Sequence, residues 1–390
     1  MTRLAISGIG VVAPGAIGLQ AFRALLDEGR SASTPIDRFD TAGLRTHDAA
    51  LVRDFKPRDF INPMKMRRMN MLSRLGVAAA KLALDDAGLD PGRNTGVAMG
   101  TAFGPVQTSV EYMQEYVEKG AALAPPQLFA ESVANAPGSH IAIESDFRGF
   151  NVTITQRESS ALAAAMYASS QIVKGSVDAA LTGGVEEVTE MTFSVLDRLG
   201  ALSPEIARPF DARRDGMVMG EGSAVLLLQA RASKAYAFFS GFGMARDTTA
   251  SISDWGDDHG AIAAAMRAAI DDAEIALGDV DAIYAGANGS VRGDAVEARA
   301  IESLFGERIP PVVATKGVFG EYAAGGALQL VAAVLAVHEQ KLHASAGFEN
   351  GDFRFTPTRE RRESALRHVL VNSVSAGGGI VCAVISREAS

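Results

Sequence analysis

Cysteine and histidine are the side chains that most often supply a nucleophile or a metal ligand, and this chain has one cysteine and six histidines. Cys382 lies within the apolar run from Gly379 to Ile385, which predicts a buried strand. A buried thiol without an electropositive, exposed setting is a poor nucleophile, so we interpret Cys382 as inert core. His338 and His343 lie five positions apart, beyond the three or four that share a helical face, and the other histidines are more widely spaced. We therefore expect no catalytic thiol and no metal site.

A glycine-rich segment, Gly8-Ile9-Gly10-Val11-Val12-Ala13, is similar to the start of a dinucleotide-binding fingerprint. In that motif the phosphates bind at the N-terminus of a helix that begins directly after the glycines. Here Pro14 and Gly15 follow at once, so no helix begins where a phosphate would need amide donors. The segment predicts a first strand and a turn, and no cofactor is expected.

Composition limits the remaining classes. The chain has 390 residues, of which 47% are hydrophobic and 21% charged, as is typical of a globular protein with a large core. A formal net charge of -9 argues against a nucleic-acid partner. The N-terminal run favours a strand over a signal peptide, and no stretch approaches the roughly 18 apolar residues of a membrane span. With a single cysteine, the sequence predicts a cytoplasmic protein without membrane association.

Short apolar runs alternate with longer helical patterns from end to end, which is typical of an α/β protein. In the first half we expect strands at 3–9, 96–100, 179–182 and 224–229, and helices at 18–26, 70–87 and 159–174. In the second half we expect strands at 235–243, 282–287, 312–315, 369–373 and 379–385, and helices at 260–273, 295–305 and 323–339. The repeated order predicts a duplication, with halves at residues 1–232 and 233–390 that share one packed body.

A series of ordered motifs resembles the β-ketoacyl synthase family of the thiolase superfamily, and the resemblance covers the whole chain. The longest match runs from Arg208-Pro209-Phe210-Asp211 through Asp215-Gly216 to Gly220-Glu221-Gly222. Other matches are segments 135–143, 149–155 and 175–186, Gly293-Asp294, Thr315-Lys316, Gly320 and Asn372-Ser373. The resemblance implies a thiolase-like fold, in which duplicated βαβαβαββ halves form a layered α-β-α-β-α body.

Working members of this family use a cysteine at a helix N-terminus as the nucleophile, together with two histidines. In this sequence the nucleophile position falls on Glu158. The first histidine loop contains no histidine, and either Gly286 or Asn288 takes that position, depending on where a gap is placed. The second histidine position falls on Glu321, while the preceding Lys316 is retained. Since these groups act as a unit, the resemblance implies that no catalytic residue remains.

A chain that keeps the motifs of this family but lacks its catalytic residues resembles the chain length factors. These subunits pair with an active ketosynthase in type II polyketide and polyene systems. The resemblance implies a non-catalytic subunit that forms a heterodimer with an active ketosynthase, shapes the acyl-chain tunnel and meets acyl carrier protein transiently. Those relatives typically carry Gln at the position of Glu158, so the acid is a departure. The tunnel-lining helix corresponds to residues 105–119, where Val106, Ser109, Val110 and Met113 share one face and Tyr112 and Tyr116 lie near its edge.

The two glutamates leave alternatives open. A buried carboxylate is costly unless it is paired, so one of them is expected to bond to Lys316, Arg157 or a partner residue. Alternatively, two nearby carboxylates with separated pKa values would serve a free-standing malonyl-carrier-protein decarboxylase or another acid-base enzyme. Ser159 and Ser160 are weaker replacement nucleophiles, because one step along a helix turns a side chain by roughly 100°.

A third alternative is a scaffold that only docks carrier protein. It would use the basic cluster Lys65, Arg67 and Arg68. Charge runs of this kind are more often solvated surface, which is the competing interpretation.

Overall fold

A computed structural model describes residues 3–252, 254–322 and 326–388. Its described strands form one 11-stranded mixed sheet in the order β11-β10-β14-β15-β9-β1-β8-β7-β5-β6, with β2 paired to β1. The first series comprises β1 (Leu4–Ala13), β2 (Ala16–Ile17), β5 (Thr95–Gly100), β6 (Asn151–Ile154), β7 (Ala179–Glu186) and β8 (Gly222–Gln229). The second comprises β9 (Ala237–Arg246), β10 (Ala282–Tyr284), β11 (Val312–Val313), β14 (His368–Val374) and β15 (Gly379–Ser386).

The two series have the same internal order. Without the short β2, the strands of each series lie in the order third, second, fourth, fifth, first. The series join where Leu4–Ile6 of β1 pairs with Ala237–Phe239 of β9. Two small ribbons lie apart from the main sheet: β3 (Thr34–Pro35) with β4 (Asp48–Ala49), and β12 (Lys341–Leu342) with β13 (Arg362–Glu363).

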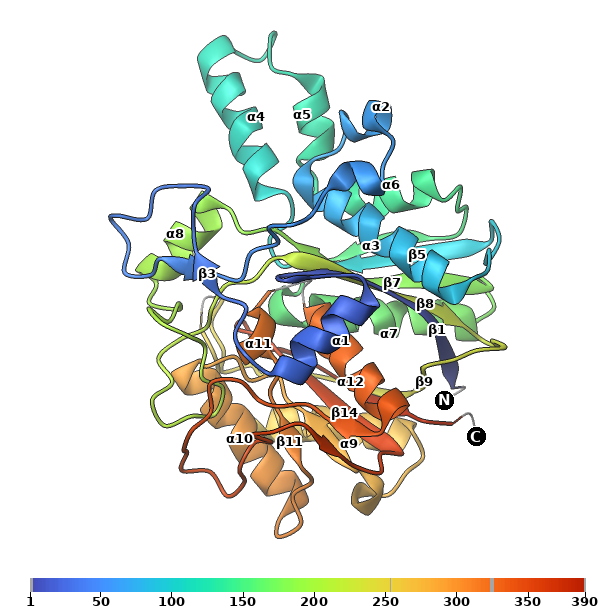
Figure 1. The fold of residues 1–390 in the computed structure, drawn as a ribbon, viewed down its shortest axis with the longest axis vertical. Coiled ribbons are helices and arrows are strands. Elements are labelled where there is room, and N and C mark those ends of the chain that lie inside the picture. Colours follow the sequence, from blue (N-terminus) through green and yellow to red (C-terminus); the bar gives the residue numbers. More distant parts are fainter. Residues whose placement is uncertain (1–2, 253, 323–325, 389–390) are drawn as a thin grey trace.

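Helices cover both faces of each half of the sheet (Figure 1). On the first half, α3 (Met71–Ala87) packs against β1 and β8, and α6 (Ala136–Glu144) packs against α3. On the second half, α9 (His259–Asp272) packs against β9 and β15 and is joined by α10 (Val291–Phe305). Between the halves lie α7 (Ser160–Val173) and α12 (Ala327–Glu339), which contact each other. This arrangement confirms the expected thiolase-like layering.

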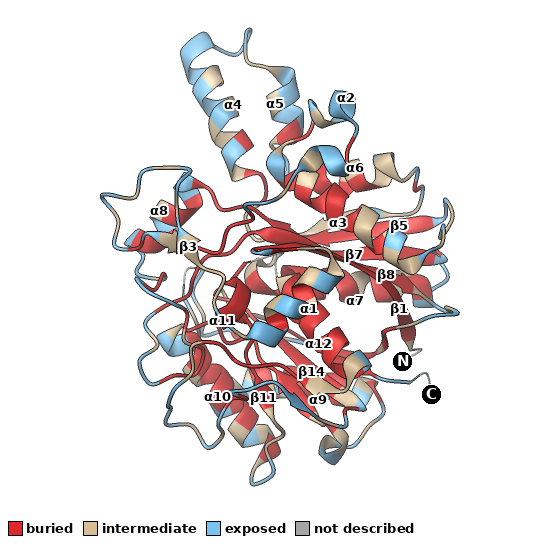
Figure 2. Cartoon of the chain, in the orientation of Figure 1, coloured by how far each residue is buried: buried red, intermediate tan, exposed pale blue. Residues whose placement is uncertain are grey.

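The central layer is apolar because both of its faces contact strands. Every residue of α12 from Ala327 to Val337 is buried, and the alanine-rich α7 is buried over most of its length. Figure 2 shows this buried centre, with exposure concentrated on the outer elements. The helices outside the core layers are α1 (Leu19–Glu28), α2 (Pro63–Met66), α4 (Val106–Lys119), α5 (Pro126–Glu131), α8 (Glu190–Arg198) and α11 (Lys316–Phe319).

The helix α3 packs so closely on β1 that Gly8 and Gly10 of that strand have no room for a side chain. Asn70 caps its start by accepting a hydrogen bond from the Ser73 backbone nitrogen at 2.7 Å, and Gly88 ends it in the left-handed conformation. A Cβ on Gly8 would lie 2.2 Å from the Ala83 carbonyl oxygen, and one on Gly10 would lie 1.9 Å from that of Ala79. These glycines therefore allow α3 to pack closely on β1, as a strand rather than a phosphate-binding loop.

Several expected boundaries differ from the structure. The strand expected at 282–287 ends at Tyr284, because the chain then turns into a loop that is bonded to buried carboxylates. The strand expected at 179–182 continues to Glu186, since its two glycines also pair with β8. The first residues of the helix expected at 323–339 lie outside the described residues. Within the described ranges, no helix is long and apolar enough to cross a membrane.

Candidate functional site

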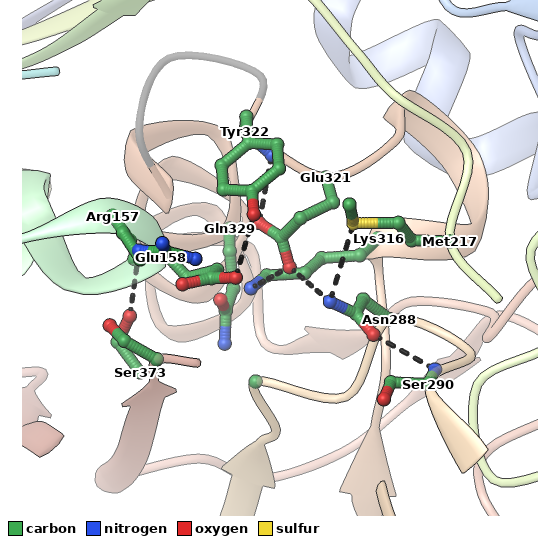
Figure 3. Close-up of polar contacts among 12 residues, drawn as sticks. Arg157, Glu158, Met217, Asn288, Ser290, Lys316, Glu321, Tyr322, Gln329 and Ser373 are labelled. Atoms are coloured by element: carbon green, nitrogen blue, oxygen red, sulfur yellow. Dashed lines mark hydrogen bonds and ion pairs between the residues drawn. The ribbon is translucent and has the colours of Figure 1, made fainter. Parts of the chain in front are cut away.

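Residues from three segments that are distant in sequence meet at one buried polar cluster (Figure 3). Glu158 lies in the short helix η2 (Arg157–Ser159) directly before α7, and Asn288 lies in the loop between β10 and α10. Lys316 begins α11, and Glu321 follows that helix. Each of these four residues is 1% exposed. The structure therefore brings together Glu158, Asn288, Lys316 and Glu321, which the sequence singled out.

The Glu321 carboxylate is bonded through both oxygens. Its Oε2 accepts a hydrogen bond from Lys316 Nζ at 2.7 Å and another from Asn288 Nδ2 at 2.8 Å. Its Oε1 accepts one from the Tyr322 backbone nitrogen at 2.8 Å. The expected pairing with Lys316 is thus confirmed for Glu321 and not found for Glu158. A buried carboxylate with a cation and two further donors is well compensated.

The Glu158 carboxyl group is bonded through one oxygen only. Its Oε1 accepts a hydrogen bond from the Tyr322 hydroxyl at 3.0 Å. Its Oε2 has no hydrogen-bond partner among the described residues. Burial, and then the negative charge of Glu321, raise the pKa of Glu158 to about 7. Such a group is present both neutral and ionised near neutral pH, so it can donate or accept a proton.

Tyr322 connects the two carboxyl groups, and the sequence analysis missed it. It is 2% exposed, and its ring meets the edge of Phe103 with centroids 4.8 Å apart. Burial and the two carboxylates raise the pKa of the Tyr322 hydroxyl, so this group remains a donor. Tyr322 and Arg157 have φ values of 63° and 48°, in the left-handed region that bulky residues rarely adopt. The only signal in the sequence was its position directly after Glu321.

The loop after β10 presents Asn288, and not Gly286, to the cluster. A Cβ built on Gly286 would lie 3.2 Å from the Asn372 carbonyl oxygen. The Gly286 backbone nitrogen donates to Glu297 at 2.9 Å, and that of Asn288 donates to Asp294 at 3.0 Å. Burial raises the pKa of Glu297 to about 7 and that of Asp294 to about 6. These two carboxyl groups hold the loop that positions Asn288.

The serines next to Glu158 are occupied by bonds to the backbone. Ser159 Oγ donates to the Ser373 carbonyl oxygen at 2.9 Å, and Ser160 Oγ lies 3.0 Å from that of Thr101. Both residues are fully buried. The Ser159 hydroxyl ties η2 to β14, the Ser160 hydroxyl ties the start of α7 to Thr101 just after β5, and neither serine lines the cavity described next.

Glu158, Asn288 and Tyr322 line a cavity of about 490 Å³. Apolar lining residues come from α8 and the position after it: Met191, Val195, Leu196 and Leu199. The lining also contains the polar residues Arg157, Asp215, Asp254, Ser290 and Arg292, together with Trp255 and Ala376. Among the described residues, no cysteine or histidine lines this cavity. Its chemistry is therefore that of carboxyl, hydroxyl, amide and guanidinium groups.

A second hollow lies along α4. Val106, Ser109, Val110 and Met113 all line a surface groove of about 620 Å³, together with Gln114, Val117, Glu118 and Met191. Val106 and Met191 also line the cavity, so the two spaces are neighbours. Tyr112 and Tyr116 do not line this groove, and Tyr112 packs against Phe129 of α5, with centroids 5.5 Å apart. The four candidate residues thus share one face of α4, as their spacing predicted.

The other residues that the sequence singled out lie away from this cluster. Cys382 is fully buried in the second half of the molecule, and burial raises the pKa of its thiol. Lys65, Arg67 and Arg68 are exposed, and Lys65 forms an ion pair with Glu144 at 3.0 Å. Within the described ranges, no group of three His, Cys, Asp or Glu side chains has an arrangement that could hold a metal ion.

Comparison with known proteins identifies the family. The family model for the β-ketoacyl synthase N-terminal domain matches residues 1–234, and that for the C-terminal domain matches residues 236–349. The chain belongs to the β-ketoacyl synthase family. The matched ranges include Glu158, Asn288, Lys316 and Glu321, so the polar cluster lies within the part of the chain that defines this membership.

Relatives within the β-ketoacyl synthase family cover almost the whole chain. The tetracenomycin polyketide synthase ketoacyl synthase alpha subunit of Streptomyces glaucescens is 31% identical over 99% of this chain and 97% of its own length. The 3-oxoacyl-[acyl-carrier-protein] synthase 2 of Coxiella burnetii is 30% identical over 99% of this chain and 98% of its own. A solved structure described as the ishigamide ketosynthase/chain length factor is 28% identical, covers 99% of both chains and has a TM-score of 0.90.

Proposed function

We propose that this member of the β-ketoacyl synthase family is a non-catalytic chain length factor, which pairs with an active ketosynthase in type II polyketide, polyene or fatty-acid-like biosynthesis. The observation that carries the proposal is the cavity that presents Glu158, with no thiol or imidazole among its described lining residues. A carboxylate does not form the stable thioester that would hold an acyl chain during condensation. The chain then contributes the shape of a tunnel and not the reaction.

The groove along α4 supports a role in shaping that tunnel. Its walls are supplied by Val106, Val110 and Met113, and it is open at the surface of the isolated chain. A partner subunit that covered this face would close the groove into a tunnel. A flexible thioether such as Met113, which is 53% exposed, suits a wall that must accommodate a variable chain.

The surface around α4 supports the pairing. Large apolar side chains are exposed on and beside α4, α5 and α8: Met113, Val117, Leu123, Phe129, Met191, Val195 and Leu199. The helix α4 contacts both α5 and α8, and large apolar side chains exposed on neighbouring helices are typical of an interaction site. In addition, β6 is an edge strand of the main sheet, and its outer hydrogen-bonding groups are available to a partner strand. In this proposal, acyl carrier protein is a transient partner that delivers the acyl units.

Native mass spectrometry of this chain with its active ketosynthase tests the pairing. Co-expression is expected to give a one-to-one complex, and incubation with acyl carrier protein substrates is expected to add acyl mass to the partner only. Val117→Asp, at a side chain that is 76% exposed, should weaken the complex. Ile252→Asp, at a side chain 83% exposed and outside α4, α5 and α8, is the matched control and should leave it intact. A homodimer alone, or an acyl adduct on this chain, would contradict the proposal.

A second candidate function is a free-standing decarboxylase or acid-base enzyme that uses Glu158 and Glu321. It is favoured by Glu158 itself, whose pKa is raised to about 7 and which lines a cavity beside the Tyr322 hydroxyl. Against it, Glu321 is held by Lys316 and does not line the cavity, and an ionised Glu158 would repel a malonyl carboxylate. Carbon dioxide release from malonyl carrier protein by the purified chain, lost in Glu158→Gln, would support this candidate, and no release would exclude the decarboxylase.

A further inference from the structure

The helices α4 and α5 form an arm that projects from the body of the molecule (Figure 1). They pack on each other, with the ring centroids of Tyr112 and Phe129 5.5 Å apart. Both helices lie wholly within the described residues, and each has a single buried residue: Thr108 in α4 and Glu131 in α5. Burial of apolar side chains therefore contributes little to holding this arm against the body.

The start of the arm is fixed by Glu186, which is fully buried at the end of β7. Its carboxyl group accepts hydrogen bonds from the Thr101 hydroxyl at 3.1 Å and from the Phe103 backbone nitrogen at 3.2 Å. The Ala102 backbone nitrogen donates to the same oxygen. These bonds hold the segment that leads into α4.

The end of the arm is fixed by Glu131, the last residue of α5. Its Oε1 lies 2.8 Å from His140 Nε2 of α6, and its Oε2 accepts a hydrogen bond from the Asn70 backbone nitrogen at 3.2 Å. The Asn70 side chain, which caps α3, also donates to the Glu131 carbonyl oxygen at 2.7 Å. A further bond, from Gln127 to the Arg68 carbonyl oxygen, is exposed and longer, at 3.4 Å. Because a buried carboxylate is stable only beside such donors, Glu131 ties the arm to both α3 and α6.

We propose that Glu131 is a positioning residue for the pairing surface, because it fixes the end of the arm and so presents α4 and α5 to the partner in one orientation. The consequence for the partner rests on the proposed function, whereas the anchoring is a property of the isolated chain. Val117 and Leu123, far from Glu131 along the arm, are 76% and 69% exposed, and a rotation at the anchored end displaces them most. An arm that is fixed before association avoids the entropic cost of ordering it on binding.

Hydrogen exchange with mass spectrometry on the isolated full chain tests the anchor without a partner. Glu131→Ala removes both carboxylate bonds, so the amides of residues 106–131 should exchange about tenfold faster, while those of β1 and β8 should exchange as in the unmodified chain. A residue that only stabilised the whole fold would change both regions. The matched control is Lys65→Met, which breaks the ion pair with Glu144 of the same helix α6 and should change neither region.

Two variants at His140 separate the hydrogen bond from the packing. His140→Gln keeps a side-chain donor that can reach Glu131, so exchange in the arm should stay close to that of the unmodified chain. His140→Phe keeps a ring without a donor and should accelerate exchange in the arm. The dissociation constant of the complex with the ketosynthase should rise about tenfold in Glu131→Ala and His140→Phe, as the oriented fraction of the arm falls, and should not change in His140→Gln.

Three results would overturn the role of Glu131. They are unchanged arm exchange in Glu131→Ala, equal acceleration in β1 and β8, and the same behaviour of His140→Gln and His140→Phe. An unchanged dissociation constant in Glu131→Ala would equally remove its link to pairing. Failure of the proposed function has a different signature, because the unmodified chain would then form no complex while arm exchange still followed the expected order.

Discussion

Lys316 and Glu321 form an ion pair at 2.7 Å although each side chain is only 1% exposed. Desolvation of two charges is expensive, and the mutual attraction offsets it only where further hydrogen bonds complete the geometry. Here Asn288 and the Tyr322 backbone nitrogen supply those bonds to Glu321. The pair therefore fixes the position of the segment after α11. This segment includes Tyr322, whose hydroxyl donates a hydrogen bond to Glu158.

Replacing Lys316 should lower the free energy of unfolding far more than replacing a basic residue of an exposed ion pair. Lys316→Met leaves Glu321 buried without a cation, which lowers the free energy of unfolding by about 3–5 kcal/mol. Urea denaturation followed by circular dichroism measures the change. The matched control is Arg30→Met, which breaks an ion pair with Glu28 whose side chains are 80% and 57% exposed, and should change stability by less than about 1 kcal/mol. Equal effects of both variants would show that the buried pair has no special role.

The stability of the chain should fall as pH rises from 5 to 8. Glu158 has a folded-state pKa of about 7 against an ordinary 4.5, so folding favours its protonated form. Its stabilising contribution is complete below the ordinary pKa and is lost as pH rises through the folded value. The loss is on the order of 3 kcal/mol for one such group. Burial raises the pKa of Glu186 to about 8 and that of Glu187 to about 7, which acts in the same direction.

The variant Glu158→Gln measures how much Glu158 alone contributes to the fall of stability with rising pH. The variant cannot ionise, so its free energy of unfolding should decline less between pH 5 and pH 8 than that of the unmodified chain. Urea denaturation at each pH gives both slopes. Glu363→Gln, at an exposed residue of β13, should leave the slope unchanged. An unchanged slope in Glu158→Gln would mean that Glu158 is ionised throughout this range.

Local patterns predicted the elements well, because each depends on residues that are near in sequence. The helix α3 spans Met71–Ala87, within one residue of the range 70–87 that its periodicity predicted. The face of α4 was also predictable, since Val106, Ser109, Val110 and Met113 are held together by helical geometry alone. The motifs then placed Glu158, Lys316 and Glu321 in one site through the family resemblance.

Features that depend on tertiary packing could not be predicted. Tyr322 reaches Glu158, which lies 164 positions earlier, and only the folded chain shows that hydrogen bond. The end of β10 at Tyr284 depends on Glu297 and Asp294 of α10, which bind the loop through backbone nitrogens. The shared lining of the cavity and the α4 groove requires Met191 of α8, which carries no motif. Pairing of Lys316 with Glu321 rather than Glu158 was likewise one of several open choices.

Filling the α4 groove should shorten the product if the groove forms the acyl tunnel. Val110→Trp and Met113→Trp place a bulky ring in the groove, and the heterodimer should then release chains shorter by about one extension unit or more, because a packed wall accepts little added volume. Liquid chromatography with mass spectrometry of the products measures the shift. Glu115→Trp, on the same helix but outside the groove, is the control and should leave chain length unchanged. Unaltered products from both groove variants would place the tunnel elsewhere.

Cys382 should remain unmodified until the chain unfolds. The thiol is fully buried in a hydrophobic cluster with Ile380 and Val384, and burial raises its pKa, so both access and the thiolate form are suppressed. Iodoacetamide at pH 8 is expected to add no mass to the native chain and to label it fully in urea, at a rate that follows unfolding. Cys382→Ala should leave product formation by the heterodimer intact, because this residue does not line the cavity or the groove. Rapid labelling of the native chain, or an acyl group found on Cys382 during turnover, would show that this thiol is reactive in the folded protein. Either result would contradict the proposed non-catalytic role.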